Sequence, residues 1–208
     1  MISGQEALAR LREGNRAFVA SIRDPGAATG QARHLPVALA QQPHAIVLGC
    51  SDSRVPAELV LGQGFGDLFV IRVAGNIVAP SQVGSVEFAV ARYGTRLAVV
   101  LGHTQCGAIL ATLEELRQPG PLQSPNLRSI VDRIRPSVEP LLAAMPGQPP
   151  DAVIAHAVRA NIRAAADHLR HGSELLERLV QRDGLLIVGA EYCLETGVVD
   201  FFDTGPAA

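Results

Sequence analysis

The stretch AIVLGCSDSR, residues 45–54, joins a short apolar run to a group of reactive side chains. Five consecutive apolar or small residues are typical of a strand that is buried on both faces of a parallel sheet. If the chain stays extended beyond Gly49, backbone alternation aims Cys50, Asp52 and Arg54 toward the same side. From these residues alone, a reactive thiol, one ligand of a zinc site and a structural ion pair are all open interpretations.

The rest of the chain alternates similar apolar runs with helical patterns. Apolar runs predict further strands at 67–75, 96–102 and 184–190, and VVDFF (198–202) predicts an antiparallel partner for the last one. The expected helices are 5–20, 82–93, 107–117, 124–144, 151–171 and 173–182, and a Pro- and Gly-containing loop is expected at 21–36. Strands that alternate with helices require crossover connections. The sequence therefore predicts an α/β fold with about four parallel strands, a C-terminal antiparallel strand and helices on both faces.

Length and composition indicate one soluble domain. A chain of 208 residues with 48% hydrophobic and 18% charged residues can bury a core and is not a disordered protein. We expect a single domain over 1–208, in which 1–35 form a helical arm and loop and 36–208 form the core.

Several classes of partner and chemistry are disfavoured by composition. The net charge is −2, and all 18 basic residues are dispersed arginines, so no nucleic-acid partner and no lysine Schiff base is expected. Apolar runs are far shorter than the ~20 residues that span a bilayer, and the N-terminus has no signal-like apolar region, so no membrane partner is expected. Three widely spaced cysteines argue against a disulfide framework and favour a reducing compartment, the cytoplasm.

Reactive residues gather after two of the predicted strands. Cys50 follows the first strand, and His103 and Cys106 follow the third, in GHTQCG. Functional crevices of open α/β sheets lie beyond the carboxyl ends of strands, so the three side chains are expected to meet. Two thiolates and an imidazole suit zinc and leave a fourth position open, as in catalytic sites. Each motif alone is weak, and the remaining Cys193 is interpreted as structural.

The combination of these motifs resembles the β-class carbonic anhydrases. GCSDSRVP (49–56) resembles the first zinc motif of that family, and GHTQCGA (102–108) resembles the second. GDLFVIRVAGN (66–76), GSVEFAV (84–90) and GLLIVGAEYCLETG (184–197) also match the family pattern. The resemblance covers most of the chain, and the Cys-x-Asp-x-Arg plus His-x-x-Cys pair is highly specific.

The resemblance implies a zinc enzyme that reversibly hydrates CO2 to bicarbonate and a proton, by attack of zinc-bound hydroxide on CO2. It assigns one Zn²⁺ per chain to Cys50, His103 and Cys106. Asp52 and Arg54 become a dyad in which Asp52 orients the nucleophile and Arg54 keeps this carboxylate off the metal. In a closed state, Asp52 itself would bind the zinc ion.

The resemblance also indicates substrate contacts and a subgroup. Substrate-binding residues by analogy are Gln41, Phe69, Ala74 and Gly107. Members regulated by bicarbonate carry a tryptophan where this chain has Val47, and the readily open members carry the glutamine found here as Gln41. The open subgroup is therefore predicted. Arg72 and Tyr192, which match bicarbonate-binding positions of the closed type, are interpreted as structural.

The family also implies a homodimer or homotetramer, in which the N-terminal helix, here 3–20, reaches a partner subunit. Two alternatives stay open at this point. The first is a hydrolase of carbonyl sulfide or carbon disulfide on the same scaffold, because these substrates are also linear heterocumulenes. The second is a zinc-binding interaction protein without catalysis. The motifs assign neither the proton shuttle nor the resting state of Asp52.

Overall fold

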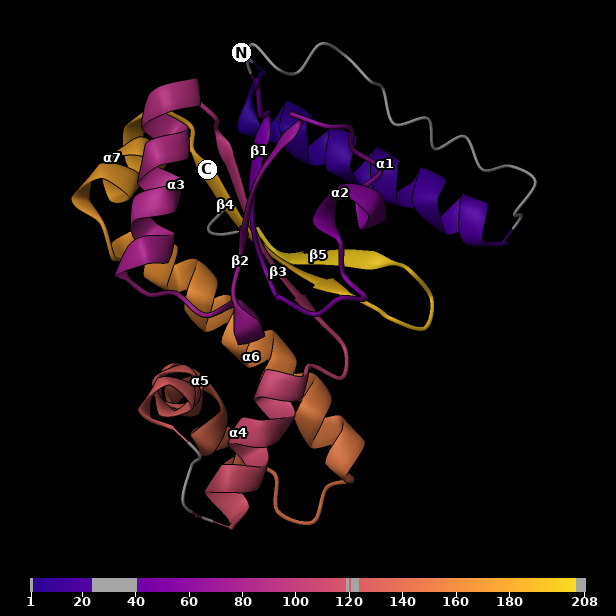
Figure 1. Cartoon of the computed structure of the whole chain (residues 1–208), viewed down its shortest axis with the longest axis vertical. Coiled ribbons are helices and arrows are strands. Elements are labelled where there is room, and N and C mark those ends of the chain that lie inside the picture. The colour runs from indigo at the N-terminus through magenta and orange to yellow at the C-terminus, as the bar shows by residue number, and fades with distance from the viewer. Residues whose placement is uncertain (1, 24–40, 119, 121–123, 205–208) are drawn as a thin grey trace.

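A single sheet forms the centre of the computed structural model, which describes residues 2–23, 41–118, 120 and 124–204. Within these ranges five strands lie in the order β2-β1-β3-β4-β5 (Figure 1). They are β1 (Ala45–Gly49), β2 (Leu68–Arg72), β3 (Leu97–His103), β4 (Leu186–Tyr192) and β5 (Val199–Asp203). The first four are parallel, and β5 pairs antiparallel with β4, as predicted.

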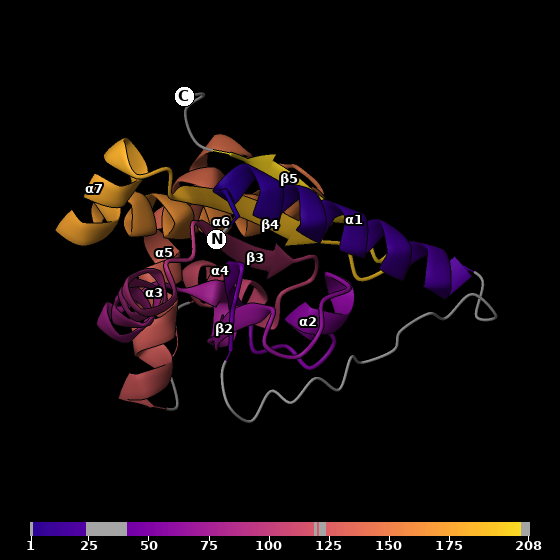
Figure 2. The same cartoon turned by 90° about the horizontal axis from the view of Figure 1, so that it is seen from above.

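Helices cover both faces of this sheet, as Figures 1 and 2 show. One face packs against α1 (Gly4–Arg23) and the short α2 (Ala57–Val60). The other face is covered by α3 (Pro80–Tyr93), α4 (Gly107–Arg117), α5 (Pro125–Ala144), α6 (Pro150–His171) and α7 (Glu174–Arg182). A 3₁₀ turn, η2 (Ala74–Asn76), follows β2. The predicted α/β class and its helical cover are confirmed.

The apolar runs form strands because both of their faces are buried. Every residue of β1 and β3 is buried, which is the pattern expected of central parallel strands. Gly102 near the end of β3 allows α6 to pack closely, because a Cβ there would lie 2.5 Å from Ile162 Cδ1. The end of β3 is therefore tightly packed against α6.

Most predicted boundaries differ from the structure by one to three residues, and two of the differences have a clear structural cause. The strand expected at 67–75 ends at Arg72, because the backbone turns into η2, where Gly75 has a φ of 69°. The loop expected at 21–36 begins later, since α1 continues to Arg23. Residues 24–40 lie outside the described part of the chain.

One buried side chain fastens α1 to the C-terminal hairpin. Asn15 donates through Nδ2 to the carbonyls of Val60 (2.8 Å) and Gly197 (2.9 Å). Its Oδ1 accepts from the backbone N–H of Val199 at 2.9 Å. The turn between β4 and β5 is thereby fixed to the first helix.

In the described ranges, no helix combines the length and the apolar character that a membrane crossing requires.

Candidate metal centre and active site

The carboxyl ends of β1 and β3 bring three ligand-type side chains together. Cys50 directly follows β1, His103 is the last residue of β3, and Cys106 caps the N-terminus of α4. Their ligand atoms all lie within 4.8 Å of one another, and all three residues are buried. The two Sγ atoms are 3.9 Å apart. Residues more than fifty positions apart in sequence thus form one compact cluster.

The two ring nitrogens of His103 have different surroundings. His103 Nδ1 lies 2.9 Å from the Thr104 carbonyl, which fixes the hydrogen on Nδ1 and leaves the lone pair on Nε2. His103 Nε2 is buried and has no hydrogen-bond partner among the described residues. An unsatisfied buried polar atom is costly, and a metal ion at this position would satisfy it. The site therefore fits a cation that binds imidazole and thiolate.

The charges of the cluster support the same conclusion. The hydrogen bond between the two thiols lowers the pKa of Cys50 and raises the pKa of Cys106. Burial lowers the pKa of His103, but the Cys50 thiolate outweighs this effect, so the pKa of His103 is raised. Cys50 therefore loses its proton readily, and the negative charge of its thiolate opposes ionisation of Cys106. A divalent cation removes that opposition, and two sulfurs with one nitrogen suit Zn²⁺.

Asp52 and Arg54 form a tight ion pair beside the cluster. Arg54 donates from Nε to Oδ1 (2.9 Å) and from Nη2 to Oδ2 (2.7 Å), and its backbone N–H also donates to Oδ1 at 2.9 Å. These bonds hold the pKa of Asp52 well below its usual range. Asp52 Oδ2 lies 3.8 Å from His103 Nε2. An ionised carboxylate thus stands next to the candidate metal position while it is engaged by a guanidinium.

Arg72 fixes the backbone that carries this pair. From the end of β2, it donates through Nε to the Cys50 carbonyl (3.1 Å) and through Nη2 to the Asp52 carbonyl (2.6 Å). Arg72 thus supports the backbone of both Cys50 and Asp52.

The C-terminal hairpin fixes the second motif. The Thr104 N–H donates to the Tyr192 carbonyl, and Thr104 Oγ1 accepts from the Leu194 N–H, both at 3.0 Å. Gln105 has a φ of 55° and donates from Nε2 to Glu195 Oε1 at 3.0 Å. Sequence reasoning missed these contacts, because Thr104 and Gln105 look like spacers between two ligands. Cys193 lies outside the cluster, with its Sγ 3.9 Å from Glu195.

The four predicted substrate residues fall into two groups. Gly107 is the first residue of α4, next to Cys106, and Ala74 begins η2, whose Gly75 contacts Cys50. Both therefore lie at the cluster.

Gln41 and Phe69 lie elsewhere. Gln41 precedes β1 and donates from Nε2 to the Tyr93 hydroxyl at 2.7 Å, and the Tyr93 and Phe69 rings are 6.1 Å apart between centroids. The cluster follows the other end of β1, and a five-residue strand spans about 16 Å. Within one chain, the structure does not bring these two residues to the cluster.

Comparisons with known proteins agree on one family. The family model described as "Carbonic anhydrase" matches residues 45–199. A carbonic anhydrase of Mycolicibacterium smegmatis is 44% identical over 128 residues, which cover 62% of this chain and 61% of that protein. Carbonic anhydrase 2 of Mycobacterium tuberculosis is 35% identical over 187 residues, which cover 90% of this chain and 87% of that protein.

Solved structures show the same fold. The β-carbonic anhydrase CafA of Aspergillus fumigatus superposes with a TM-score of 0.74 at 27% identity, covering 98% of this chain and 92% of that chain. A tetrameric β-carbonic anhydrase of Sordaria macrospora gives 0.71 at 24% identity, covering 92% of this chain and all of that chain. Since the family match runs from β1 to the start of β5 and a relative covering nine tenths of the chain shares 35% identity, the chain belongs to the β-class carbonic anhydrases, zinc enzymes that hydrate CO2.

Proposed function

We propose that this chain hydrates CO2 reversibly at a zinc ion held by Cys50, His103 and Cys106, with Asp52 and Arg54 as the orienting dyad. The observation that carries the proposal is the set of three buried ligand atoms within 4.8 Å of one another, beside an ion-paired carboxylate. Zinc bound by such residues lowers the pKa of a water molecule, so that hydroxide is available near neutral pH as the nucleophile for CO2.

The dyad has two tasks in this proposal. The Asp52 carboxylate accepts the hydrogen of the nucleophile and so directs a lone pair of the nucleophilic oxygen toward CO2. A free carboxylate near zinc would compete for the open ligand position. Arg54 opposes this by occupying both Asp52 oxygens with charge-assisted hydrogen bonds, and Arg72 holds the supporting backbone.

The bidentate ion pair also supports assignment to the readily open subgroup. Asp52 is turned toward Arg54 with bonds of 2.7 and 2.9 Å. Val47 is fully buried in the face of the sheet that packs against α1, where the bicarbonate-regulated members carry a tryptophan. The open state, with Asp52 off the metal, is therefore our proposed resting state.

We expect the hydration rate to rise with pH between about 6.5 and 9, because two thiolates offset the zinc charge and make the water less acidic than three imidazoles would. The pKa of Asp52 is well below its usual range, so Asp52 stays ionised throughout this interval and adds no second transition. Stopped-flow CO2 hydration by protein of measured zinc content tests this expectation. A flat rate over the interval would contradict it.

We further propose that the enzyme works as a homodimer or homotetramer. Gln41 and Phe69 lie at the sheet end opposite their own cluster, so they can serve as substrate contacts only for the cluster of a second copy. Phe69 adjoins Phe88, a residue that is 52% exposed and whose ring centroid is 6.1 Å from that of Phe69. An exposed aromatic surface of this kind fits a subunit contact.

Complementation between two variants tests this arrangement. Gln41→Ala keeps the cluster, and Cys106→Ser keeps Gln41, so a mixed oligomer contains a complete site only if Gln41 acts on its partner's cluster. Mixed oligomers, purified through two different tags, are expected to exceed the hydration rate of the Gln41→Ala protein per intact cluster. A rate per cluster equal to that of Gln41→Ala alone would show that Gln41 does not act across subunits.

We propose that 1–208 form one domain, with 1–35 as the arm and loop and 36–208 as the core. Leu8 and Leu11 of α1 are buried against the chain's own sheet, and this supports the single domain. A partner contact of α1 would use its more exposed second half, residues 16–21. A cytoplasmic location is supported by the need to keep Cys50 and Cys106 reduced for metal binding.

A further inference from the structure

An asparagine of α6 contacts the turn that lies behind the metal ligands. Asn161 is 3% exposed and donates from Nδ2 to the Gly75 carbonyl at 2.8 Å. The contact joins the middle of α6 to η2, segments that are 86 residues apart in sequence. A buried hydrogen bond between residues so distant in sequence fixes the orientation of the backbone at Gly75.

Gly75 in turn contacts a candidate zinc ligand. Its N–H donates to Cys50 Sγ at 3.4 Å. Gly75 has a φ of 69°, and a Cβ at this position would lie 2.9 Å from Ile134 Cδ1 and 3.0 Å from Ala108 Cβ. The turn is therefore pressed between α4 and α5, and only glycine fits both the space and the backbone conformation.

We propose that Asn161 is a positioning residue that sets the charge on the Cys50 sulfur through Gly75. By holding the Gly75 carbonyl, Asn161 fixes how the turn is oriented and keeps the Gly75 N–H aimed at the sulfur. A hydrogen bond from a backbone N–H to a thiolate withdraws negative charge from the sulfur, so the sulfur donates less charge to the metal. Groups that form hydrogen bonds to metal ligands commonly tune both metal affinity and activity. The inference rests on the proposed role of Cys50 as a metal ligand.

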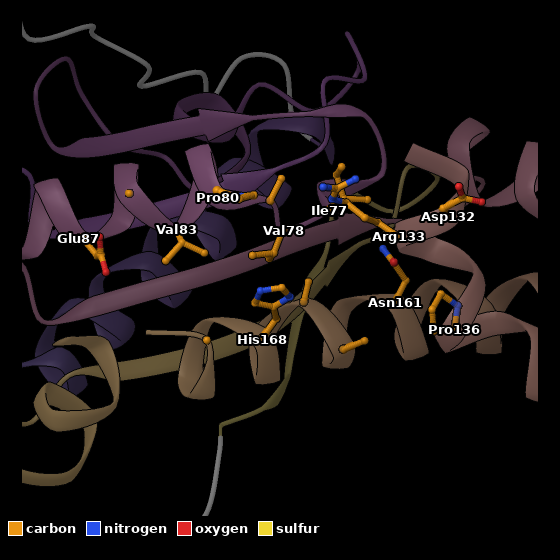
Figure 3. Close-up of a pocket in the computed structure, with 15 residues that line it drawn as sticks. Ile77, Val78, Pro80, Val83, Glu87, Asp132, Arg133, Pro136, Asn161 and His168 are labelled. Carbon is orange, nitrogen blue, oxygen red and sulfur yellow. The ribbon is translucent and has the colours of Figure 1, made fainter. Parts of the chain in front are cut away.

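The surroundings of Asn161 make it suitable for substitution. It forms part of the wall of a cavity of about 700 Å³, which Ile77, Val78 and His168 also line (Figure 3). A shortened side chain at this position leaves space that opens into the cavity, so the core on the opposite side of the turn keeps its packing. The chain also offers a control, because Asn15 is another buried asparagine that bonds backbone groups, and none of these groups contacts a candidate ligand sulfur.

The test compares wild type, Asn161→Ala and Asn15→Ala in two measurements. The first is the sulfur-to-metal charge-transfer absorption of the cobalt-substituted proteins, and the second is the rate at which the zinc proteins release metal to a chelator. For Asn161→Ala we expect the absorption to move to longer wavelength, because a sulfur without its hydrogen bond gives up charge more easily. We also expect metal release to accelerate by about 10-fold or more, since the Gly75 turn no longer holds Cys50 in place.

Asn15→Ala is the control for loss of stability, and Asn161→Ser is the substitute if Asn161→Ala does not fold. Asn15→Ala is expected to lower the melting temperature and to leave the absorption unchanged; a shift equal to that of Asn161→Ala would overturn the inference. Unchanged absorption and metal release in Asn161→Ala would also overturn it, and Asn161→Ser is measured instead if the alanine variant does not fold. A wild-type cobalt protein without thiolate absorption would refute the proposed ligand set itself, which is a distinguishable failure.

Discussion

Asp52→Asn is expected to lower the rate of CO2 hydration by about 100-fold while the protein still binds one zinc ion per chain. The amide has nearly the same shape as the carboxylate but carries no charge, so it accepts the hydrogen of the nucleophile only weakly. It also removes the negative charge and one of the two oxygens that accept from the Arg54 guanidinium at 2.7 and 2.9 Å. Stopped-flow hydration and zinc analysis on the same preparations measure both effects.

A second carboxylate provides the control for this substitution. Asp151 is an exposed residue in the first turn of α6, outside the site, so Asp151→Asn makes the same chemical change elsewhere. Its hydration rate should equal that of the wild type. Equal rates for Asp52→Asn and wild type would instead remove the dyad from the mechanism, and zinc loss in Asp52→Asn would mean that Asp52 supports metal binding.

Cys106→Ser is expected to abolish zinc binding and to reduce hydration to the uncatalysed background. A serine hydroxyl stays protonated at neutral pH and is a poor zinc ligand, and the exchange leaves only Cys50 and His103. The wild type should also lose thermal stability when a chelator removes its zinc, because a ligand present at about 1,000 times its Kd stabilises a folded protein by about 4 kcal/mol. The variant should show no such zinc-dependent shift.

Cys193→Ser is the matched control, since it makes the same exchange at a cysteine outside the cluster. It should keep its zinc, its activity and its chelator-sensitive melting temperature. Full zinc occupancy in Cys106→Ser would exclude Cys106 as a ligand. Zinc loss in Cys193→Ser would show that the third cysteine takes part in binding the metal.

The parts of the fold that sequence predicts well are those in which one physical signal dominates. The β1 and β3 runs are apolar throughout because both faces are buried, and α4 was predicted with its observed bounds, 107–117. The sequence did not reveal α2 or η2, since elements of four and three residues are too short to show a period. The conformation of η2 depends instead on contacts of Gly75 with α4 and α5.

The candidate site shows a similar division. The strand-end rule predicted that Cys50, His103 and Cys106 would meet, because parallel neighbouring strands end at the same edge. Asn161 could not be recognised, since its contact with Gly75 arises only when α6 packs behind the turn. The position of Gln41 at the far end of β1 follows from the predicted strand at 45–49, which separates Gln41 from Cys50, but the family resemblance assigns its role without stating which subunit supplies the residue.

The hydrogen bonds that fix the second motif also bear on how the protein matures during synthesis. Thr104 and Gln105 are held by Tyr192, Leu194 and Glu195, which the ribosome adds roughly ninety residues later. Asn15 and its partner Val199 are separated by 184 residues, an even longer interval. Contacts between such distant residues form late in folding. A nascent chain that already contains all three ligand residues but not residues 192–199 therefore lacks these contacts, and we expect the metal centre to become ordered only after that segment has been synthesised.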